Sequence, residues 1–180
     1  MPVSVKGVVE LRKALRQFTP DLGKGLTKEM GAALKPITRT ARGYLPSNSE
    51  VLSNWQGTKT RAEGAFPQYD YTVARRGVTY KTSPSKPNRK GFRSLATIFN
   101  KSAAGAIYET AGRKTPNSVF VQNLNNKTAG VMRGQNKMQG RVIYRAWYED
   151  QGKTTAAVLK AIEKAAATFQ ARSKVRWVMS

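Results

Sequence analysis

The 180-residue chain contains neither cysteine nor histidine. Without cysteine it can form no disulfide, no thiolate nucleophile and no zinc site with sulfur ligands. Without histidine it has no imidazole base and no Ser-His-Asp triad. Carboxylate, Lys, Tyr or magnesium chemistry stays open, but the chain has only 10 acidic residues, and they are scattered. The composition therefore favours an enzyme least, and we expect no catalytic residue, no metal and no cofactor.

Long hydrophobic runs are also missing. No continuous apolar stretch approaches the roughly 20 residues that span a bilayer, and residues 1–7 lack the apolar stretch of a signal peptide. We therefore expect a protein without membrane contact that acts inside a cell, or inside a particle assembled there. The lack of cysteine is consistent with assembly in a reducing cytoplasm.

Positive charge is what the chain has in excess. Its 32 Lys and Arg against 10 Asp and Glu give a formal net charge of +22. A charge of this size repels itself and requires a counter-charge from nucleic acid, an acidic protein or another anionic surface. Between Tyr71 and Tyr148, fifteen cations stand against a single acid, Glu109.

Both ends of the chain show helical periodicity. Apolar residues three and four apart predict a first helix over residues 8–18. Residues 19–21, Thr-Pro-Asp, are typical of a helix start, and the apolar stripe that follows predicts a long second helix over 22–44, kinked at Pro36. A final helix is predicted over residues 154–169.

The middle of the chain has the period-two pattern of strands. Residues 69–73 and 78–82 alternate around a turn that contains glycine, which predicts a hairpin. Residues 95–99 form another candidate strand, and residues 141–148 a closing strand or the entry to a short helix.

Polar segments separate these elements. We expect extended loops or arms at residues 47–67, 83–93 and 117–140, and a tail at residues 175–180. The predicted fold is a single α+β domain over residues 1–180. In it, two amino-terminal helices and a carboxy-terminal helix pack with a twisted antiparallel sheet.

The densest basic run is the candidate binding site for an anionic partner. Tyr71, Tyr80 and Phe92 are interleaved with its cations. Cations neutralise phosphates and aromatic faces stack on bases, so the run is compatible with nucleic acid. It is equally compatible with acidic residues of another subunit. The cations are Arg75, Arg76, Lys81, Lys86, Arg89, Lys90 and Arg93.

Acidic residues offer little for catalysis. Glu109, alone among cations, is typical of an ion-pair anchor. A nuclease that uses Glu109 with Asp70 or Glu149 and magnesium is formally open, but no acidic pair lies at a spacing that builds such a site. Glu149 and Asp150 precede a predicted helix, where negative charge is favourable.

Large aromatic residues are the remaining candidates. Trp147 stands beside Tyr144 and Tyr148, which favours a place in the core. Trp55 and Trp177 lie in less regular segments, so either is a candidate anchor of an interface. With Tyr108 and Glu109, these three tryptophans form our set of subunit-interface or core anchors.

The order of these parts resembles the tail-completion, or neck, proteins of long-tailed bacteriophages, a group that includes the minor tail protein Z type. In that family an aromatic residue, an acid, one residue and a glycine follow one another, whereas here two residues separate Glu109 from Gly112. The matching parts are Leu11-x-x-x-Leu15, Thr19-Pro20-Asp21-Leu22, Ala33-x-x-Pro36, Ala41-x-x-x-Leu45-Pro46, Ala106-Ile107-Tyr108-Glu109-x-x-Gly112 and the final helix.

The resemblance implies a virion structural protein without enzymatic activity. Such a subunit would assemble in the host cytoplasm as a homo-oligomeric ring, a hexamer or alternatively a dodecamer. The ring would lie in the neck as a head-tail connector and join the portal of the DNA-filled head to the tail tube. Its protein partners would be connector or stopper proteins and tail-terminator or tail-tube proteins. A contact with DNA is compatible with this role. The alternative is a stand-alone basic nucleic-acid-binding protein.

Overall fold

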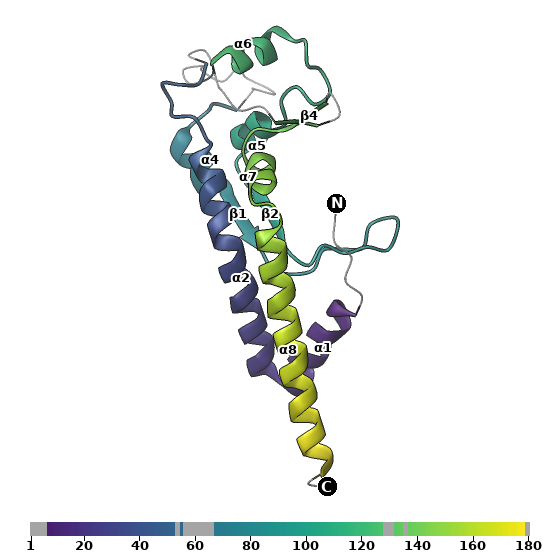
Figure 1. Cartoon of the computed structure of the whole chain (residues 1–180). Coiled ribbons are helices and arrows are strands. Elements are labelled where there is room, and N and C mark those ends of the chain that lie inside the picture. The colour runs from purple at the N-terminus through teal and green to yellow at the C-terminus, as the bar shows by residue number, and fades with distance from the viewer. Residues whose placement is uncertain (1–6, 53–54, 56–66, 128–131, 135–136, 179–180) are drawn as a thin grey trace. The chain divides into compact units, whose positions relative to one another are not determined.

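Helices dominate the computed structural model, which describes residues 7–52, 55, 67–127, 132–134 and 137–178. The fold is mixed α+β and rich in helix (Figure 1). The chain groups into two compact units. Unit 1 comprises residues 1–36, 80–97 and 152–180, and unit 2 comprises residues 37–79 and 98–151.

The terminal helices follow the sequence prediction closely. Helices α1 (Val8–Phe18) and α2 (Pro20–Gly43) begin and end near the expected residues, and α2 continues through Pro36. Helix α8 (Lys153–Val178) begins where expected but runs beyond residue 169. Of the predicted tail at residues 175–180, residues 175–178 belong to α8, and residues 179–180 lie outside the described part.

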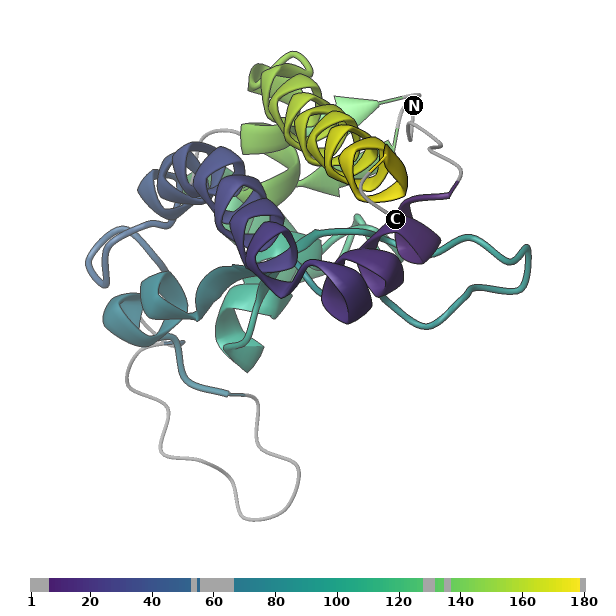
Figure 2. The same cartoon turned by 90° about the horizontal axis from the view of Figure 1, so that it is seen from below.

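Unit 1 is built on α1, the first part of α2, and α8, with α2 and α8 side by side (Figures 1 and 2). Its core contains Leu15 and Met30, both fully buried, packed with residues of α8 such as Ile162. Two exposed ion pairs link α2 to α8: Lys164 with Glu29 at 2.8 Å, and Arg172 with Asp21 at 2.7 Å. Exposed pairs of this kind stabilise little, so apolar packing holds unit 1.

The described part of unit 2 includes the short helices α4 (Tyr71–Gly77), α5 (Ala103–Thr110), α6 (Val119–Lys127) and α7 (Ile143–Glu149). They pack with the end of α2 around an aromatic core. The core members at its centre are all less than 4% exposed: Trp55, Tyr69, Tyr108, Leu124 and Val142.

The described strands form two small sheets. Strand β1 (Val78–Lys81) pairs with β2 (Thr97–Asn100), and β3 (Met132–Gly134) pairs antiparallel with β4 (Lys137–Gly140). In the second sheet, Gly134 lies opposite Lys137 and Met132 opposite Gly140. Each sheet has two strands, so the sheet structure in the described residues is smaller than the sequence predicts.

The hairpin predicted over residues 69–82 is wrong in its first half. Tyr71–Gly77 forms α4, because the Asp70 carboxylate accepts a hydrogen bond from the backbone N–H of Val73 at 2.7 Å and caps the helix. The second half forms β1, which pairs with β2 instead. A single capping carboxylate therefore outweighed the period-two pattern.

The long loop predicted over residues 117–140 is also wrong. Its first part forms α6, and its second part contains β3 and β4. The segment predicted as a closing strand or helix entry over 141–148 is helical, as α7. Most of the loop predicted at 47–67 lies outside the described residues. In the described part of the chain, no helix has the length and apolar character to cross a membrane.

Candidate functional site

Glu109, the lone acid of the basic region, is 7% exposed near the end of α5. Its Oε2 accepts hydrogen bonds from the backbone N–H groups of Arg141, Val142 and Ile143, at 3.2, 2.6 and 3.1 Å. Its Oε1 accepts a fourth from Tyr144 at 3.0 Å. These groups lie at the amino-terminal end of α7, where no side chain of α7 itself supplies a cap. Glu109 therefore supplies the cap and a favourable charge from another helix.

Arg141 does the converse for the carboxy-terminal end of α5. Its guanidinium donates to the carbonyl oxygens of Tyr108 at 3.0 Å and Ala111 at 2.6 Å, and to Oδ1 of Asn125 at 2.7 Å. Burial lowers the pKa of Arg141, while Tyr108 and Glu109 oppose that shift. We call this exchange between Glu109 and Arg141 the reciprocal cap.

Close backbone approach makes the reciprocal cap possible. A Cβ at Gly140 would collide with the Glu109 carboxylate and with Cβ of Tyr144 at 2.7 Å. Glycine at this position lets the chain pass close to the carboxylate before α7 begins. The reciprocal cap therefore joins α5, β4 and α7 within unit 2.

The carboxylates named for a nuclease have structural tasks. Both oxygens of Glu109 are occupied by four amides, and Asp70 caps α4. Among the described residues, no three acidic side chains gather closely enough to hold a metal ion. The third candidate, Glu149, belongs to a separate polar cluster.

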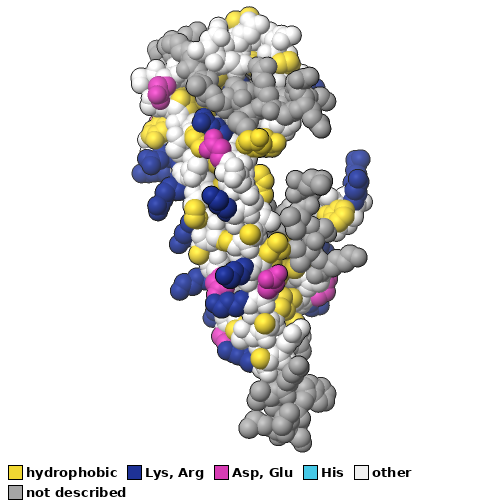
Figure 3. All heavy atoms as spheres, in the orientation of Figure 1, with side chains coloured by type: hydrophobic (Ala, Val, Ile, Leu, Met, Phe, Trp, Pro, Cys, Tyr) yellow, Lys and Arg dark blue, Asp and Glu magenta, His cyan; other side chains and the backbone are white. Residues whose placement is uncertain are grey.

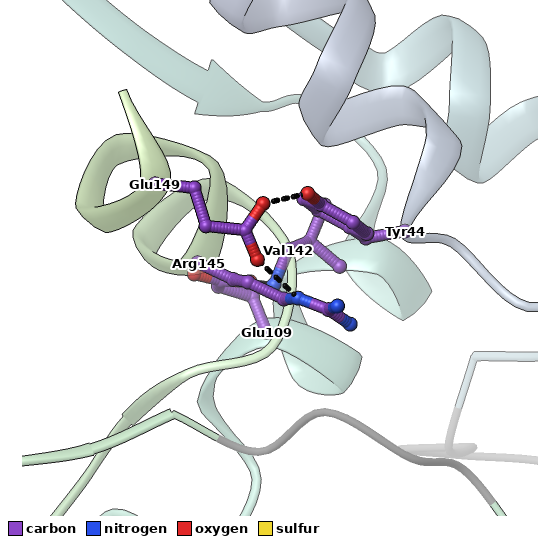
Figure 4. A network of polar contacts seen from close by, with 5 residues as sticks. All are labelled: Tyr44, Glu109, Val142, Arg145 and Glu149. Atoms are coloured by element: carbon purple, nitrogen blue, oxygen red, sulfur yellow. Dashed lines mark hydrogen bonds and ion pairs between the residues drawn. The ribbon is translucent and has the colours of Figure 1, made fainter. Parts of the chain in front are cut away.

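That cluster joins the end of α2 to α7 (Figure 4). Glu149 accepts a hydrogen bond from the Tyr44 hydroxyl and pairs with Arg145 at 2.9 Å. The Arg145 guanidinium lies 4.0 Å from the centre of the Tyr44 ring, within the range of a cation–π contact. The hydrogen bond from Tyr44, followed by the one from Arg145, lowers the pKa of Glu149.

The tryptophans separate into different environments. Trp55 is 3% exposed, and its indole N–H donates to the carbonyl of Pro67 at 2.7 Å. Trp147 is 47% exposed, so its predicted place in the core is wrong. Trp177 belongs to α8, and its side chain lies outside the described residues. Tyr108, 2% exposed, is a core residue of unit 2.

The predicted basic run is divided between the two units. Arg75 and Arg76 are exposed in the last turn of α4, in unit 2. The other members belong to unit 1 and are exposed as well: Lys81, Lys86, Arg89, Lys90 and Arg93. Figure 3 shows that Lys and Arg side chains outnumber acidic ones on one face.

Residues 82–96, which we call the arm, connect β1 to β2 and protrude from them (Figures 1 and 2). Ser85 and Ser94 are hydrogen-bonded across its base. At the tip, Oδ1 of Asn88 accepts from the N–H groups of Lys90 and Phe92, both at 2.9 Å. Gly91 completes the turn with φ of 80°. The arm therefore has a defined turn, and it carries cations and the 58% exposed ring of Phe92.

A second cationic site in unit 1 was missed by the sequence reasoning. An open groove of about 420 Å³, which we call the α1 groove, lies along one face of α1. Its lining residues are Val9, Arg12, Lys13, Arg16, Gln17 and Pro84. The spacing of Arg12, Lys13 and Arg16 along α1 could have indicated a cationic helix face. The contribution of Pro84 could not have been predicted, because it comes from the base of the arm, far away in the sequence.

Comparisons with known protein families, curated proteins and solved structures find no significant match to this chain.

Proposed function

We propose that the chain is a structural subunit of a phage neck ring that joins the portal of the DNA-filled head to the tail tube. One observation carries the proposal. The segment that bears the most distinctive part of the resemblance, residues 106–112, contains Tyr108 from the core and Glu109 from the reciprocal cap. Its chemistry is used to hold unit 2 together, as a building subunit requires.

The charge supports an assembly role. The chain has 32 Lys and Arg but only 10 Asp and Glu, which leaves a net charge of +22. Even if every acidic residue paired with a cation, most of the cations would need counter-charge from outside the chain. DNA in the neck channel or acidic neighbouring subunits would supply it. The proposal includes the family arrangement, in which the three terminal helices pack with a twisted antiparallel sheet, and it includes no catalytic step.

Deletion of the gene from the phage that encodes it tests the proposal. We expect DNA-filled heads and complete tails to accumulate unjoined, and an antibody against the chain to label the necks of wild-type particles. Neighbouring genes for portal, capsid and tail-tube proteins are expected as well. Normal joined particles in the deletion strain would overturn the proposal.

A stand-alone nucleic-acid-binding protein is the second candidate, and the arm favours it. Lys86, Arg89, Lys90 and Arg93 lie close in sequence to the exposed Phe92, on a preformed turn. Cations contact phosphates and an exposed aromatic ring stacks on a base. Tight, salt-sensitive binding of the purified chain to short DNA, with no labelling of phage necks, would favour this candidate over the neck role.

A further inference from the structure

The α1 groove carries positive charge, and none of the described residues that line it supplies a carboxylate. Arg12 is 7% exposed, and its guanidinium donates to two neutral acceptors, the carbonyl of Thr82 and the sulfur of Met30. Arg16 follows one turn later, and like charges at this spacing destabilise a helix. Burial, followed by the charge of Arg16, lowers the pKa of Arg12. An anionic group in the groove would offset both effects.

The walls of the groove are not purely polar. Val9 and Pro84 line it together with the side chains of the cations, whose aliphatic stems are apolar. Among the described lining residues, none is Asp or Glu. The complementary occupant therefore combines a flat apolar or aromatic body with a carboxylate. A phosphodiester backbone, which is polar throughout, would leave the apolar walls unused.

The same chain presents such a group in unit 2. Trp147 and Tyr148 are 47% and 64% exposed at the end of α7, and the acidic residues Glu149 and Asp150 follow directly. They are the one adjacent acidic pair in the sequence. The Glu149 side chain remains 41% exposed while it contacts Tyr44 and Arg145. We call residues 147–150 the aromatic–acidic tip.

We propose that the α1 groove of one copy binds the aromatic–acidic tip of a second copy. Aromatic rings stack on Arg and Lys, and Trp, Tyr and Arg are the residues that most often dominate interface energies. The carboxylates would meet Arg12, Lys13 and Arg16. At physiological salt, screening over about 8 Å limits the repulsion between the net charges of the copies. Local complementarity then decides the contact.

The geometry of this contact suits a ring. Groove and tip are different surfaces, so the interface is heterologous, and heterologous contacts repeat into rings or filaments. The inference deepens the proposed function and rests on it, since it names the contact between neighbouring ring subunits.

Two variants test the contact, one with a changed groove and an intact tip, the other with a changed tip and an intact groove. The groove variant carries Lys13→Glu and Arg16→Glu, both at exposed positions, and the tip variant carries Trp147→Ala and Tyr148→Ser. Sedimentation velocity over a concentration series at physiological salt should show wild-type oligomers. Each variant alone should associate roughly thirtyfold more weakly, the size of loss expected for a dominant interface residue.

Mixing the variants gives the sharpest result. The intact tip of the groove variant can enter the intact groove of the tip variant, but neither copy can extend the chain further. The equimolar mixture should therefore form dimers and nothing larger. Lys24→Glu with Lys28→Glu, two exposed positions on α2, is the matched control because it makes the same change in net charge. It should associate like the wild type.

A wild type that stays monomeric at every concentration would overturn the contact. So would variants that associate normally, larger oligomers in the mixture, or a control that fails as the groove variant does. If the wild type is monomeric and binds a short DNA duplex, and the groove variant does not bind that duplex, the groove is a nucleic-acid site instead. Introduction of both variants into the phage separates the two proposals. If phage that carries either variant still forms joined particles whose necks the antibody labels, the contact is refuted and the neck role stands. If the antibody does not label the necks of wild-type particles, the neck role is refuted.

Discussion

A single carboxylate receives four backbone amides in this protein. In Glu109→Gln the side chain keeps its size but loses its charge, and its NH₂ group faces the N–H donors of α7. We expect a loss of about 3 kcal/mol in the free energy of unfolding, the order found when a buried charged hydrogen-bonding group is removed. Denaturant unfolding followed by tryptophan fluorescence measures it.

The matched control is Glu163→Gln on α8, because Glu163 is exposed. Exposed substitutions of this kind change the unfolding free energy by about 0.5 kcal/mol or less. Equal effects at the two positions would show that the reciprocal cap contributes nothing particular to stability.

Tyr44 should control the titration of Glu149. The hydrogen bond from the Tyr44 hydroxyl is the first cause of the lowered pKa of Glu149, and Arg145 is the second. Because the folded-state pKa lies below the unfolded one, this contact stabilises the fold above the ordinary Glu pKa and is lost as the pH falls through the folded value. In Tyr44→Phe the pKa of Glu149 should rise toward its usual value.

Carboxyl NMR titration of the wild type and the variant measures that rise. Tyr148→Phe is the matched control, since it removes an exposed tyrosine hydroxyl from α7, the helix that contains Glu149. An unchanged pKa of Glu149 in Tyr44→Phe would mean that the hydroxyl does not bind the carboxylate in solution.

Among the elements, the arm has a turn that is held by the side chain of Asn88. Asn88→Ala removes the acceptor for the amides of Lys90 and Phe92. We expect the NMR order parameters of these two amides to fall to about 0.6 or below, the range of flexible backbone, with global stability unchanged. Lys86→Ala in the same arm should leave them as they are. Rigid amides in Asn88→Ala would show that the Asn88 side chain does not shape the turn.

Which elements the sequence could predict follows from the range of the interactions that form them. The helices α1, α2 and α8 carry apolar residues at helical spacing, so their own residues determined them. The segment 69–82 was ambiguous because its alternating residues favoured a strand, while Asp70 capped a helix. Helix α6 lies in a polar segment whose inward residues, Val121 and Leu124, are buried only by tertiary packing.

The sites were harder to predict than the helices for the same reason. Glu109 was interpreted as an anchor, but its partners are amides 32 to 35 residues later, which no local pattern indicates. The α1 groove needs Pro84 beside α1. The exposure of Trp147 also depends on tertiary packing. Its aromatic neighbours in the sequence favoured a place in the core instead.

For the whole molecule, the charge leads to a prediction about salt. Changing Arg75, Arg76, Arg89 and Lys90 together to Gln should leave the fold intact, since all four are exposed. It should weaken binding to a short DNA duplex and flatten the dependence of log Kd on log salt. Each lost phosphate contact reduces that slope by about 0.9. Fluorescence anisotropy from low to high salt measures both effects.

The two pairs belong to different units, so each is also tested alone. If Arg75→Gln with Arg76→Gln accounts for the whole change, the arm does not contact the anion. A slope that matches the wild type in the quadruple variant would show that these cations are incidental to binding.

The division of the chain between the units also sets an order of events during synthesis. Unit 2 is complete in sequence at Gln151, whereas the core of unit 1 requires Ala161, Ile162 and Ala165 from α8. Unit 2 can therefore fold while α8 is still being made, and unit 1 must wait for the last part of the chain. A fragment ending at residue 151 should keep Trp55 shielded from a fluorescence quencher while residues 8–34 exchange their amides freely. Premature termination before Ala161 would then remove the α1 groove and leave the reciprocal cap in place.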